Sequence, residues 1–220
     1  MELSAVLLAR VIGFVETNDL NPRGKLSFPM LVPLIVNKFN FQKYPQEAKD
    51  FDEQKGVEFI EGHTGDTSID KLVVWYNGIQ LDVRSSTDEA RKIIDSTLSW
   101  LKKEAGLNYS PSMIKRWAYL SQVTFYSEVD LDSAHAAIAR LSMSVTKIVS
   151  EINQMELQFK PTGLTWSFDR TMKQVPVASF LIQRRADTPF SEGKYFSEAP
   201  LPTDAHIKLL EQFESDLLTK

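Results

Sequence analysis

The sequence predicts an α+β protein built from two pseudo-repeats of the order β-α-β-β-(β)-α, in which long, curved antiparallel strands pack on helices. Several short runs alternate apolar and polar side chains, which is typical of strands with one buried face. Other stretches space their apolar residues by three and four, which is typical of amphipathic helices. In addition, residues 203–211 match residues 87–95 without a gap: Thr, Asp and Lys are identical, and the aliphatic pair and the final acid are kept in kind.

The overall composition is that of an ordinary globular protein. The chain has 220 residues, of which 43% are hydrophobic and 25% charged, and this length is enough for one large or two small folded units. Its formal net charge of −4 disfavours a protein that coats nucleic acid through a basic surface. The chain has no cysteine, so we expect no disulfides or thiolate metal sites, and a cytoplasmic location is the default.

Residues 5–15 form one apolar run near the N-terminus. Glu2 precedes the run, Arg10 interrupts it, and no small-residue cleavage site follows directly, so it does not resemble a secretory signal. It is also shorter than the roughly 20 residues that a membrane helix needs. We therefore expect a buried first strand over residues 4–17 and no membrane contact.

The first half continues with alternating strand and helix signals. Pro33 favours a helix that begins near it, because proline is tolerated in the first helical turn. Asn77 and Gly78 predict a type I′ hairpin, which needs positive φ at both central residues. Ser86 and Glu89 have the spacing of a capping box, and Gly106 is typical of a helix end. The expected strands are residues 57–61, 72–76 and 79–84, and the expected helices are residues 33–40 and 86–105.

The second half begins after a proline-containing loop at residues 108–112. A long strand is expected first, and then a helix capped by Asp130 or Asp132. The apolar residues of that helix recur every three or four positions and predict a single buried seam: Leu131, Ala134, Ile138, Leu141, Val145, Ile148 and Ile152. The expected strands are residues 114–128, 155–160, 164–168 and 175–185. Residues 186–202 are expected to be a long connection without secondary structure, which leads to the last helix at 203–220.

These elements suggest two halves, residues 1–108 and 109–220, packed as one compact unit. One difference between the matched helices is that Pro202 stands where Ser86 caps the first copy, so the second helix needs another cap. The element order resembles the repeat unit of TATA-binding-protein-like and helix-grip folds. This resemblance concerns element order alone, and no sequence motif of either family accompanies it.

Polar side chains alternate along two of the expected strands and so form a polar sheet face: Gln80, Asp82, Arg84, Thr165, Ser167 and Asp169. An antiparallel sheet can leave one face in water, so solvent exposure is the simplest interpretation. A concave surface that binds a partner is the alternative.

Histidine and two carboxylates occur in one glycine-containing loop. His63, Asp66 and Asp70 have the chemistry of a divalent-metal or acid–base site. Their spacing matches no established ligand pattern, and turns are naturally rich in glycine and aspartate. A solvated turn is therefore the favoured interpretation, and a metal-dependent hydrolase is the weaker one.

Basic and aromatic residues gather near the expected long connection. Arginines beside aromatic rings are suited to a phosphate or to stacking on bases, and with Arg84 from the polar face the binding candidates are Arg84, Arg170, Lys173, Arg184, Arg185, Tyr195 and Phe196. The favoured interpretation is that Arg184 or Arg185 pairs with Asp187 or Glu192 and so fixes the connection.

No catalytic or cofactor motif stands out. The sequence contains no G-x-S-x-G elbow, no G-x-x-x-x-G-K-[ST] loop and no G-x-G-x-x-G, so the standard nucleophile and nucleotide signatures are absent. We expect a non-enzymatic interaction or assembly subunit of a cytoplasmic complex, with another protein or a second copy as partner and with no cofactor. Phosphate or nucleic-acid binding around Arg184 and Arg185 is the alternative.

Overall fold

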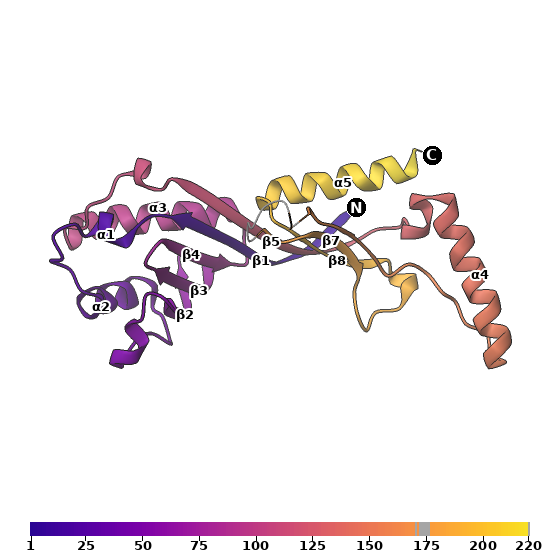
Figure 1. Cartoon of the computed structure of the whole chain (residues 1–220), viewed down its shortest axis with the longest axis horizontal. Coiled ribbons are helices and arrows are strands. Elements are labelled where there is room, and N and C mark those ends of the chain that lie inside the picture. Colours follow the sequence, from indigo (N-terminus) through magenta and orange to yellow (C-terminus); the bar gives the residue numbers. More distant parts are fainter. Residues whose placement is uncertain (170, 172–176, 220) are drawn as a thin grey trace. The chain divides into compact units, whose positions relative to one another are not determined.

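The computed structural model describes residues 1–169, 171 and 177–219. It is an α+β structure with one eight-stranded antiparallel sheet in the order β2-β3-β4-β1-β5-β8-β7-β6, accompanied by five α-helices among the described residues (Figure 1). The chain divides into two compact units. We call Val6–Ser121 with Pro200–Asp204 the N-terminal unit, and Met1–Ala5, Gln122–Ala199 and Ala205–Lys220 the C-terminal unit.

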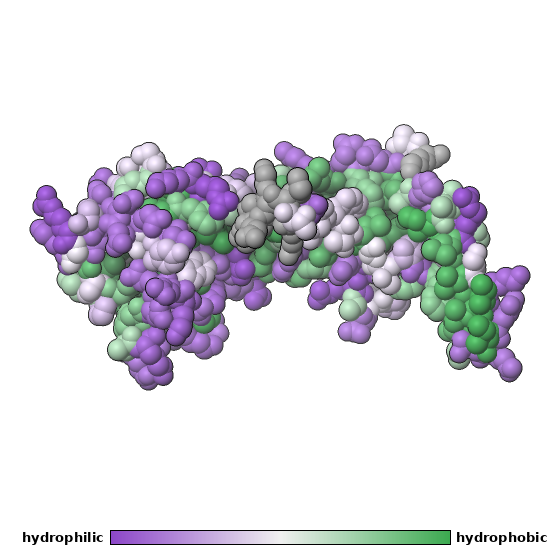
Figure 2. Space-filling model, in the orientation of Figure 1, coloured by the Kyte–Doolittle hydropathy of each residue, from purple (hydrophilic) through white to green (hydrophobic). Residues whose placement is uncertain are grey.

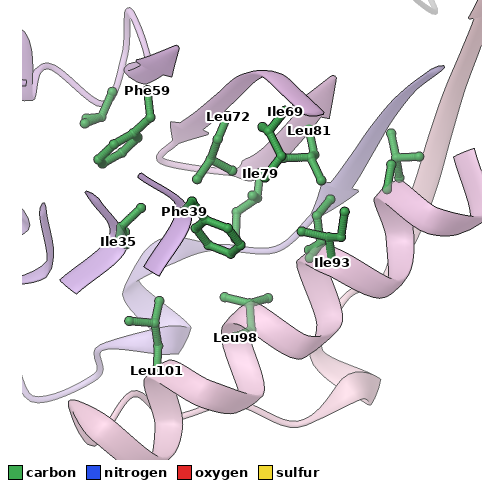
Figure 3. Packing of buried hydrophobic residues seen from close by; sticks show 14 of the residues in the cluster. Ile35, Phe39, Phe59, Ile69, Leu72, Ile79, Leu81, Ile93, Leu98 and Leu101 are labelled. Atoms are coloured by element: carbon green, nitrogen blue, oxygen red, sulfur yellow. The ribbon is translucent and has the colours of Figure 1, made fainter. Parts of the chain in front are cut away.

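The N-terminal unit places two helices on one face of its strands. In chain order its elements are β1 (Glu2–Phe14, which begins in the other unit), α1 (Thr17–Leu20), α2 (Phe28–Phe39), β2 (Val57–Thr64), β3 (Thr67–Trp75), β4 (Gly78–Val83) and α3 (Thr87–Glu104). Leu72 from β3, and Ile79 and Leu81 from β4, meet α2 and α3 (Figure 3). The helices supply the other half of this core through Ile35, Phe39, Ile93, Leu98 and Leu101, all of them buried.

The expected start of α3 is confirmed. The Ser86 hydroxyl accepts a hydrogen bond from the Glu89 N–H at 3.1 Å, which satisfies one of the free donors of the first turn. The apolar stripe of α3 faces the strands and is buried. The sequence was therefore sufficient to predict both the residue at which α3 begins and the face that it buries.

The expected start of α2 at Pro33 is wrong. The helix begins at Phe28, with Pro29 in its first turn and Pro33 inside it. Pro33 has no N–H to give to the carbonyl of Pro29, and both prolines are exposed, so that carbonyl faces water. A proline on the solvent side of a helix is tolerated for this reason.

The hairpin between β3 and β4 is confirmed, but its turn type is not. Trp75 pairs with Gly78, so the turn residues are Tyr76 and Asn77, and neither they nor Gly78 has a positive φ. The backbone of Tyr76 is fixed by neighbouring segments: its N–H donates to Glu53 and its carbonyl accepts from Thr17. These contacts from outside the hairpin override the local preference of Asn-Gly for a type I′ turn.

The C-terminal unit follows the predicted order but differs in two segments. Its elements are β5 (Arg116–Tyr126, which begins in the other unit), α4 (Ala136–Asn153), β6 (Gly163–Trp166), β7 (Phe180–Arg184), β8 (Lys194–Ala199) and α5 (Thr203–Leu218). The connection at 186–202, expected to lack secondary structure, contains β8, which pairs with β7. Residues 155–160, expected to form a strand, are extended without strand pairing. Short 3₁₀ turns complete the chain at Ala48–Phe51, Pro111–Met113, Leu131–Ala134 and Phe190–Glu192.

The first residues of α3 and α5 cap each other. The Thr87 N–H donates to the Thr203 hydroxyl at 3.1 Å, and the Thr203 N–H donates to the Thr87 hydroxyl at 2.8 Å. Both threonines are buried, so neither amide can turn to water instead. This exchange supplies the cap that Pro202 cannot give to α5.

We expect Thr87→Val to lower the free energy of unfolding by about 1–3 kcal/mol, because it leaves the buried N–H of Thr203 without an acceptor. Thr87→Ser keeps the hydroxyl and serves as the matched control. Urea denaturation of both variants measures the difference. Equal stability of the valine and serine variants would show that the hydroxyl contact contributes nothing.

Candidate interaction surface

Helix α4 is formed by local signals of only moderate strength. The His135 ring nitrogen Nδ1 accepts the Ala137 N–H at 3.1 Å and so caps the first turn. Gln154 closes the other end in the left-handed conformation, and Ala136, Ala137 and Ala139 favour the helix. Against this, the helix contains several β-branched residues, which have lower helix propensity, and no acidic residue lies in its first turn.

One flank of α4 is held by the extended segment that follows it. The Thr146 hydroxyl accepts the Phe159 N–H at 2.8 Å, and the Ser150 hydroxyl accepts the Leu157 N–H at 3.1 Å. Thr146 and Ser150 are one helical turn apart and therefore lie on the same flank. The segment thus covers the polar flank of α4 rather than its apolar one.

The apolar face of α4 is exposed. The exposed fractions are 64% for Leu141, 55% for Ile148 and 73% for Ile152, and no residue of the helix is buried. Figure 2 shows a band of hydrophobic residues along α4. We call Ile138, Leu141, Val145, Ile148 and Ile152 the α4 seam. The helix was predicted, but its expected cap at Asp130 or Asp132 is wrong: α4 begins at Ala136 with His135 as its cap, and Leu131 and Ala134 lie in the preceding 3₁₀ turn. The expected burial of the seam is also wrong.

The seam itself carries no charge, and the charged residues of α4 lie beside it. Arg140, Lys147 and Glu151 fall on one side of the seam when the helix is viewed along its axis, with 3.6 residues per turn. The seam spacing is 3, 4, 3 and 4 residues, the heptad pattern of helices that pair with other helices. The surface is therefore an uncharged stripe with a charged border.

Arg184, a predicted binding residue, is part of an internal ion pair. Its side chain is 5% exposed and pairs with Asp130, which also pairs with Lys160. The Arg184 guanidinium lies 4.6 Å from the ring centre of Phe190 and 5.2 Å from that of Tyr195. Its carboxylate partner is Asp130, whereas the sequence suggested Asp187 or Glu192.

Tyr195 lies beside Arg184, and Gly193 lets the start of β8 approach Ser127. Tyr195 is buried against Phe125, with ring centres 5.5 Å apart, and its hydroxyl donates to the Val129 carbonyl at 3.3 Å. Burial raises the pKa of the Tyr195 hydroxyl. Gly193 has a φ of +58°, and a Cβ there would lie 2.2 Å from the Ser127 carbonyl oxygen, so only glycine lets the chain approach so closely.

The other predicted binding residues do not join Arg184 in one exposed cluster. Arg185 is exposed and Phe196 is half-buried. Arg84 belongs to the N-terminal unit, where it pairs with Asp70 at 2.9 Å. Arg170 and Lys173 lie outside the described residues.

The predicted metal ligands do not form a site. His63 and Asp66 are exposed, and Asp70 is engaged by Arg84. Over the described part of the chain, no three histidine, aspartate or glutamate side chains are grouped so that they could hold a metal ion. The expected loop is a hairpin instead: His63 lies in β2 and Asp70 in β3, and only Gly65 and Asp66 form the turn between these paired strands.

The expected polar sheet face is closed at β4. Gln80 and Asp82 are buried, and Arg10 forms two hydrogen bonds to the Asp82 carboxylate at 2.8 and 2.7 Å. Gln80 donates to the same carboxylate at 2.9 Å. These residues satisfy one another, so the expectation that they lie on an open face is wrong.

Sequence reasoning missed a buried serine–histidine contact. Ser197 Oγ and His206 Nε2 lie 2.8 Å apart, a distance that also suits a nucleophile and its base. Both residues are 0% exposed, and the serine hydroxyl is also 2.6 Å from the Leu181 carbonyl, to which it donates. Neither group can reach a substrate, so the contact is structural. Only the alternation of Tyr195, Ser197 and Ala199 in the sequence hinted at a strand here.

Comparison with known proteins adds no functional information. Among the described residues, no helix is both long and apolar enough to cross a bilayer. No protein-family model matches the chain, and no curated protein matches it. Among the described residues, the α4 seam is a continuous apolar surface with three exposed side chains.

Proposed function

We propose that this protein is a non-enzymatic assembly module that self-associates by pairing the α4 seams of two copies. The observation that carries the proposal is the exposure of Leu141, Ile148 and Ile152 on the apolar face of a helix that has no buried residue. The earlier expectation of a complex subunit is kept, and α4 replaces the sheet face as its contact surface. The lack of cysteine supports a reducing, cytoplasmic setting.

Helix stability supports the need for a partner. Isolated helices shorter than about 12–15 residues are marginal in water, and most helices in proteins are stabilised by packing of their apolar face. Helix α4 has 18 residues, but six of them are β-branched valine, isoleucine or threonine. A covering partner would supply the packing that its own unit does not.

A second copy of α4 in the antiparallel direction fits the seam. Leu141, Val145, Ile148 and Ile152 are spaced by 4, 3 and 4 residues, so the sequence of gaps is the same in both directions. When two seams run antiparallel, Leu141 of each copy lies opposite Ile152 of the other, and Val145 opposite Ile148. Every contact is then apolar against apolar, and the helix dipoles oppose each other favourably.

The charged border favours the same arrangement. In the antiparallel pair, Arg140 of one copy approaches Glu151 of the other on the same side of the seam, and this happens twice because of the two-fold symmetry. Such pairs at the edge of a helix contact select orientation more than they add affinity. The two Lys147 side chains meet near the two-fold axis as like charges, so the support for the antiparallel direction comes from the opposite charges at its two ends.

The size of the surface predicts a weak, reversible dimer. At 1.5 Å per residue, α4 is about 27 Å long, and its exposed face is about 10 Å wide, which gives roughly 300 Å². A standard stable interface buries about 800 Å² on each partner. Association is therefore expected only at high protein concentration, unless a larger assembly holds several copies together.

Sedimentation at increasing protein concentration tests this proposal. The wild-type protein is expected to move from monomer to dimer, and Ile148→Glu is expected to raise the concentration needed at least tenfold, because each copy would bury a carboxylate against Val145 of the other. Met143→Glu puts the same charge on an exposed site off the seam and is the matched control. A wild-type protein that stays monomeric throughout would overturn the proposal.

A charge exchange tests the direction of the helices. Arg140→Glu and Glu151→Arg are each expected to weaken association, and the double variant is expected to restore it. Failure of the double variant to recover would argue against the antiparallel pair while leaving the seam itself in place.

We also propose that the halves 1–108 and 109–220 repeat one plan, as in TATA-binding-protein-like and helix-grip folds. Several features support this. In each half a long strand leads to a helix of more than two turns, three strands and a last helix, and the first half adds the short α1 after its long strand. In the sheet order, β4, β3 and β2 extend from β1 as β8, β7 and β6 extend from β5. The matched residues Thr87 and Thr203 also cap each other.

A further inference from the structure

The N-terminal unit contains a cavity that is independent of the α4 seam. Its volume is about 310 Å³, and it opens between α2, α3 and the ends of β3 and β4. Figure 3 shows several residues of its inner end, among them Ile35, Ile79, Leu98 and Leu101. The remaining apolar lining residues are Leu20, Leu26, Phe28, Pro29, Leu31, Phe51, Val74 and Leu107.

The outer wall of the cavity is held by hydrogen bonds as well as by packing of Leu20 and Leu26. The Asn21 side chain donates to the Leu26 carbonyl at 2.6 Å and accepts the Leu26 N–H at 3.3 Å. Asn108 binds the residues just before this loop: its backbone N–H donates to the Leu20 carbonyl at 2.8 Å, and its side chain donates to the Asp19 carbonyl at 2.9 Å. These hydrogen bonds hold the loop in place at the edge of the cavity.

The polar lining is small and carries one charge. It consists of Thr17, Asn18, Asn21, Ser27 and Glu53. The Thr17 hydroxyl lies 2.9 Å from one carboxylate oxygen of Glu53, and no described residue is hydrogen-bonded to the other oxygen. Glu53 is thus an acceptor with spare capacity beside an otherwise apolar space.

We propose that this cavity binds a small amphipathic molecule with an apolar body and an amine or hydroxyl head that donates to Glu53. An apolar cavity of about 150 Å³ accepts benzene, so 310 Å³ takes an apolar molecule of about twelve non-hydrogen atoms. Binding pockets of this kind are mostly apolar, with few polar groups that fix orientation. Glu53 selects against a carboxylate head, because two like charges would meet in a partly desolvated place.

Calorimetric titration with decylamine, 1-decanol and decanoate, each below its aggregation concentration, tests the proposal. The three probes share one chain and differ in the head group. We expect one decylamine per chain, with weaker binding of 1-decanol and at least tenfold weaker binding of decanoate. No saturable binding of any probe would overturn the proposal.

Two variants separate head-group selection from filling of the cavity. Glu53→Gln is expected to remove the preference for decylamine over decanoate and to leave 1-decanol binding within about twofold; Glu104→Gln, which removes an exposed charge outside the cavity, is the control. Leu31→Trp, on the half-buried wall, is expected to fill the space and abolish binding of all three probes. Unchanged head-group preference in Glu53→Gln, or unchanged binding in a folded Leu31→Trp protein, would contradict the assignment.

This inference does not depend on the proposed assembly function. Ile148→Glu changes the α4 seam and is expected to bind decylamine like the wild-type protein. Loss of binding in that variant would contradict the assignment of the ligand to this cavity.

Discussion

Acidification from pH 6.5 to about pH 4 is expected to remove about 3 kcal/mol of stability through His206 alone. The ring of His206 is 0% exposed and lies edge-on to Phe180, with centres 5.6 Å apart. Its Nε2 contacts Ser197 Oγ at 2.8 Å, while its Nδ1 is buried without a hydrogen-bond partner among the described residues. Because Ser197 donates to the Leu181 carbonyl, Nε2 carries the proton and Nδ1 is the unprotonated nitrogen.

Protonation would place a second N–H, and a charge, at Nδ1 with nothing to accept it. Burial therefore lowers the pKa of His206 from 6.5 to about 4. Below pH 6.5 the unfolded chain binds a proton that the folded chain does not, so the free energy of unfolding falls as the pH falls. One pKa unit is worth about 1.4 kcal/mol, and the loss is complete near the folded-state pKa.

Urea denaturation at intervals between pH 7 and pH 4, compared with His206→Gln, measures this effect. The variant cannot take up a proton at this position. Its free energy of unfolding is therefore expected to fall by about 3 kcal/mol less than that of the wild-type protein over the same interval. Carboxylates such as Asp130 add a loss at the acid end that is common to both proteins. Parallel pH profiles for the two proteins would show that His206 does not titrate as its burial requires.

The sequence was sufficient for the elements whose signals are local. The helix at Ser86 begins where its cap predicts, and the strands around Asn77 pair as a hairpin. Each of these depends on residues within a few positions of one another. The α+β class and antiparallel sheet follow from such signals, because alternation and helical spacing set which face of each element is apolar.

The sequence was insufficient where distant segments decide the outcome. The turn at Tyr76 takes its shape from Thr17 and Glu53, and the strand at 194–199 becomes regular because β7 lies beside it. An apolar stripe on a helix predicts that something covers it, but spacing does not say whether the cover is the same chain. Helix α4 shows this limit. The spacing of its apolar residues was predicted, but the exposure of Leu141, Ile148 and Ile152 could not be predicted from that spacing.

The candidate sites follow the same division. Arginine beside aromatic residues was identified as a cluster at Arg184 and Tyr195, and the two do lie 5.2 Å apart. Their role depends on Asp130, which is 54 residues away in the sequence. The cavity beside Glu53 was not predicted at all, because its lining comes from many separate segments and a void leaves no pattern in a sequence.

Removal of the Asp130 carboxylate is expected to be among the most destabilising single changes outside the apolar core. Arg184 is 5% exposed, and it depends on Asp130 for its ion pair. Breaking a buried pair from one side costs about 3–5 kcal/mol, because the remaining charge stays desolvated. Asp130 is itself 38% exposed, so we expect Asp130→Ala to cost about 3 kcal/mol, at the lower end of that range.

Removal of Arg184, the other partner of the pair, is expected to lower the free energy of unfolding much less. Burial acts to raise the pKa of Asp130, but hydrogen bonds from Lys160 and Arg184 outweigh it and hold the pKa below its ordinary value. In Arg184→Met, Asp130 keeps Lys160 and its contact with water, and methionine can still pack against Phe190 and Tyr195. A cost of about 1 kcal/mol is therefore expected, and Arg185→Met, which changes an exposed arginine, serves as the control with almost none.

The double variant distinguishes an ion pair from two independent residues. If the cost of Asp130→Ala comes from stranding Arg184, then adding Arg184→Met removes the stranded charge and recovers part of the lost stability. Urea denaturation of the two single variants and the double variant at pH 7 gives this coupling directly. Simple additivity of the two single costs would mean that Arg184 is stabilised by stacking on Phe190 and Tyr195 and not by its ion pair with Asp130.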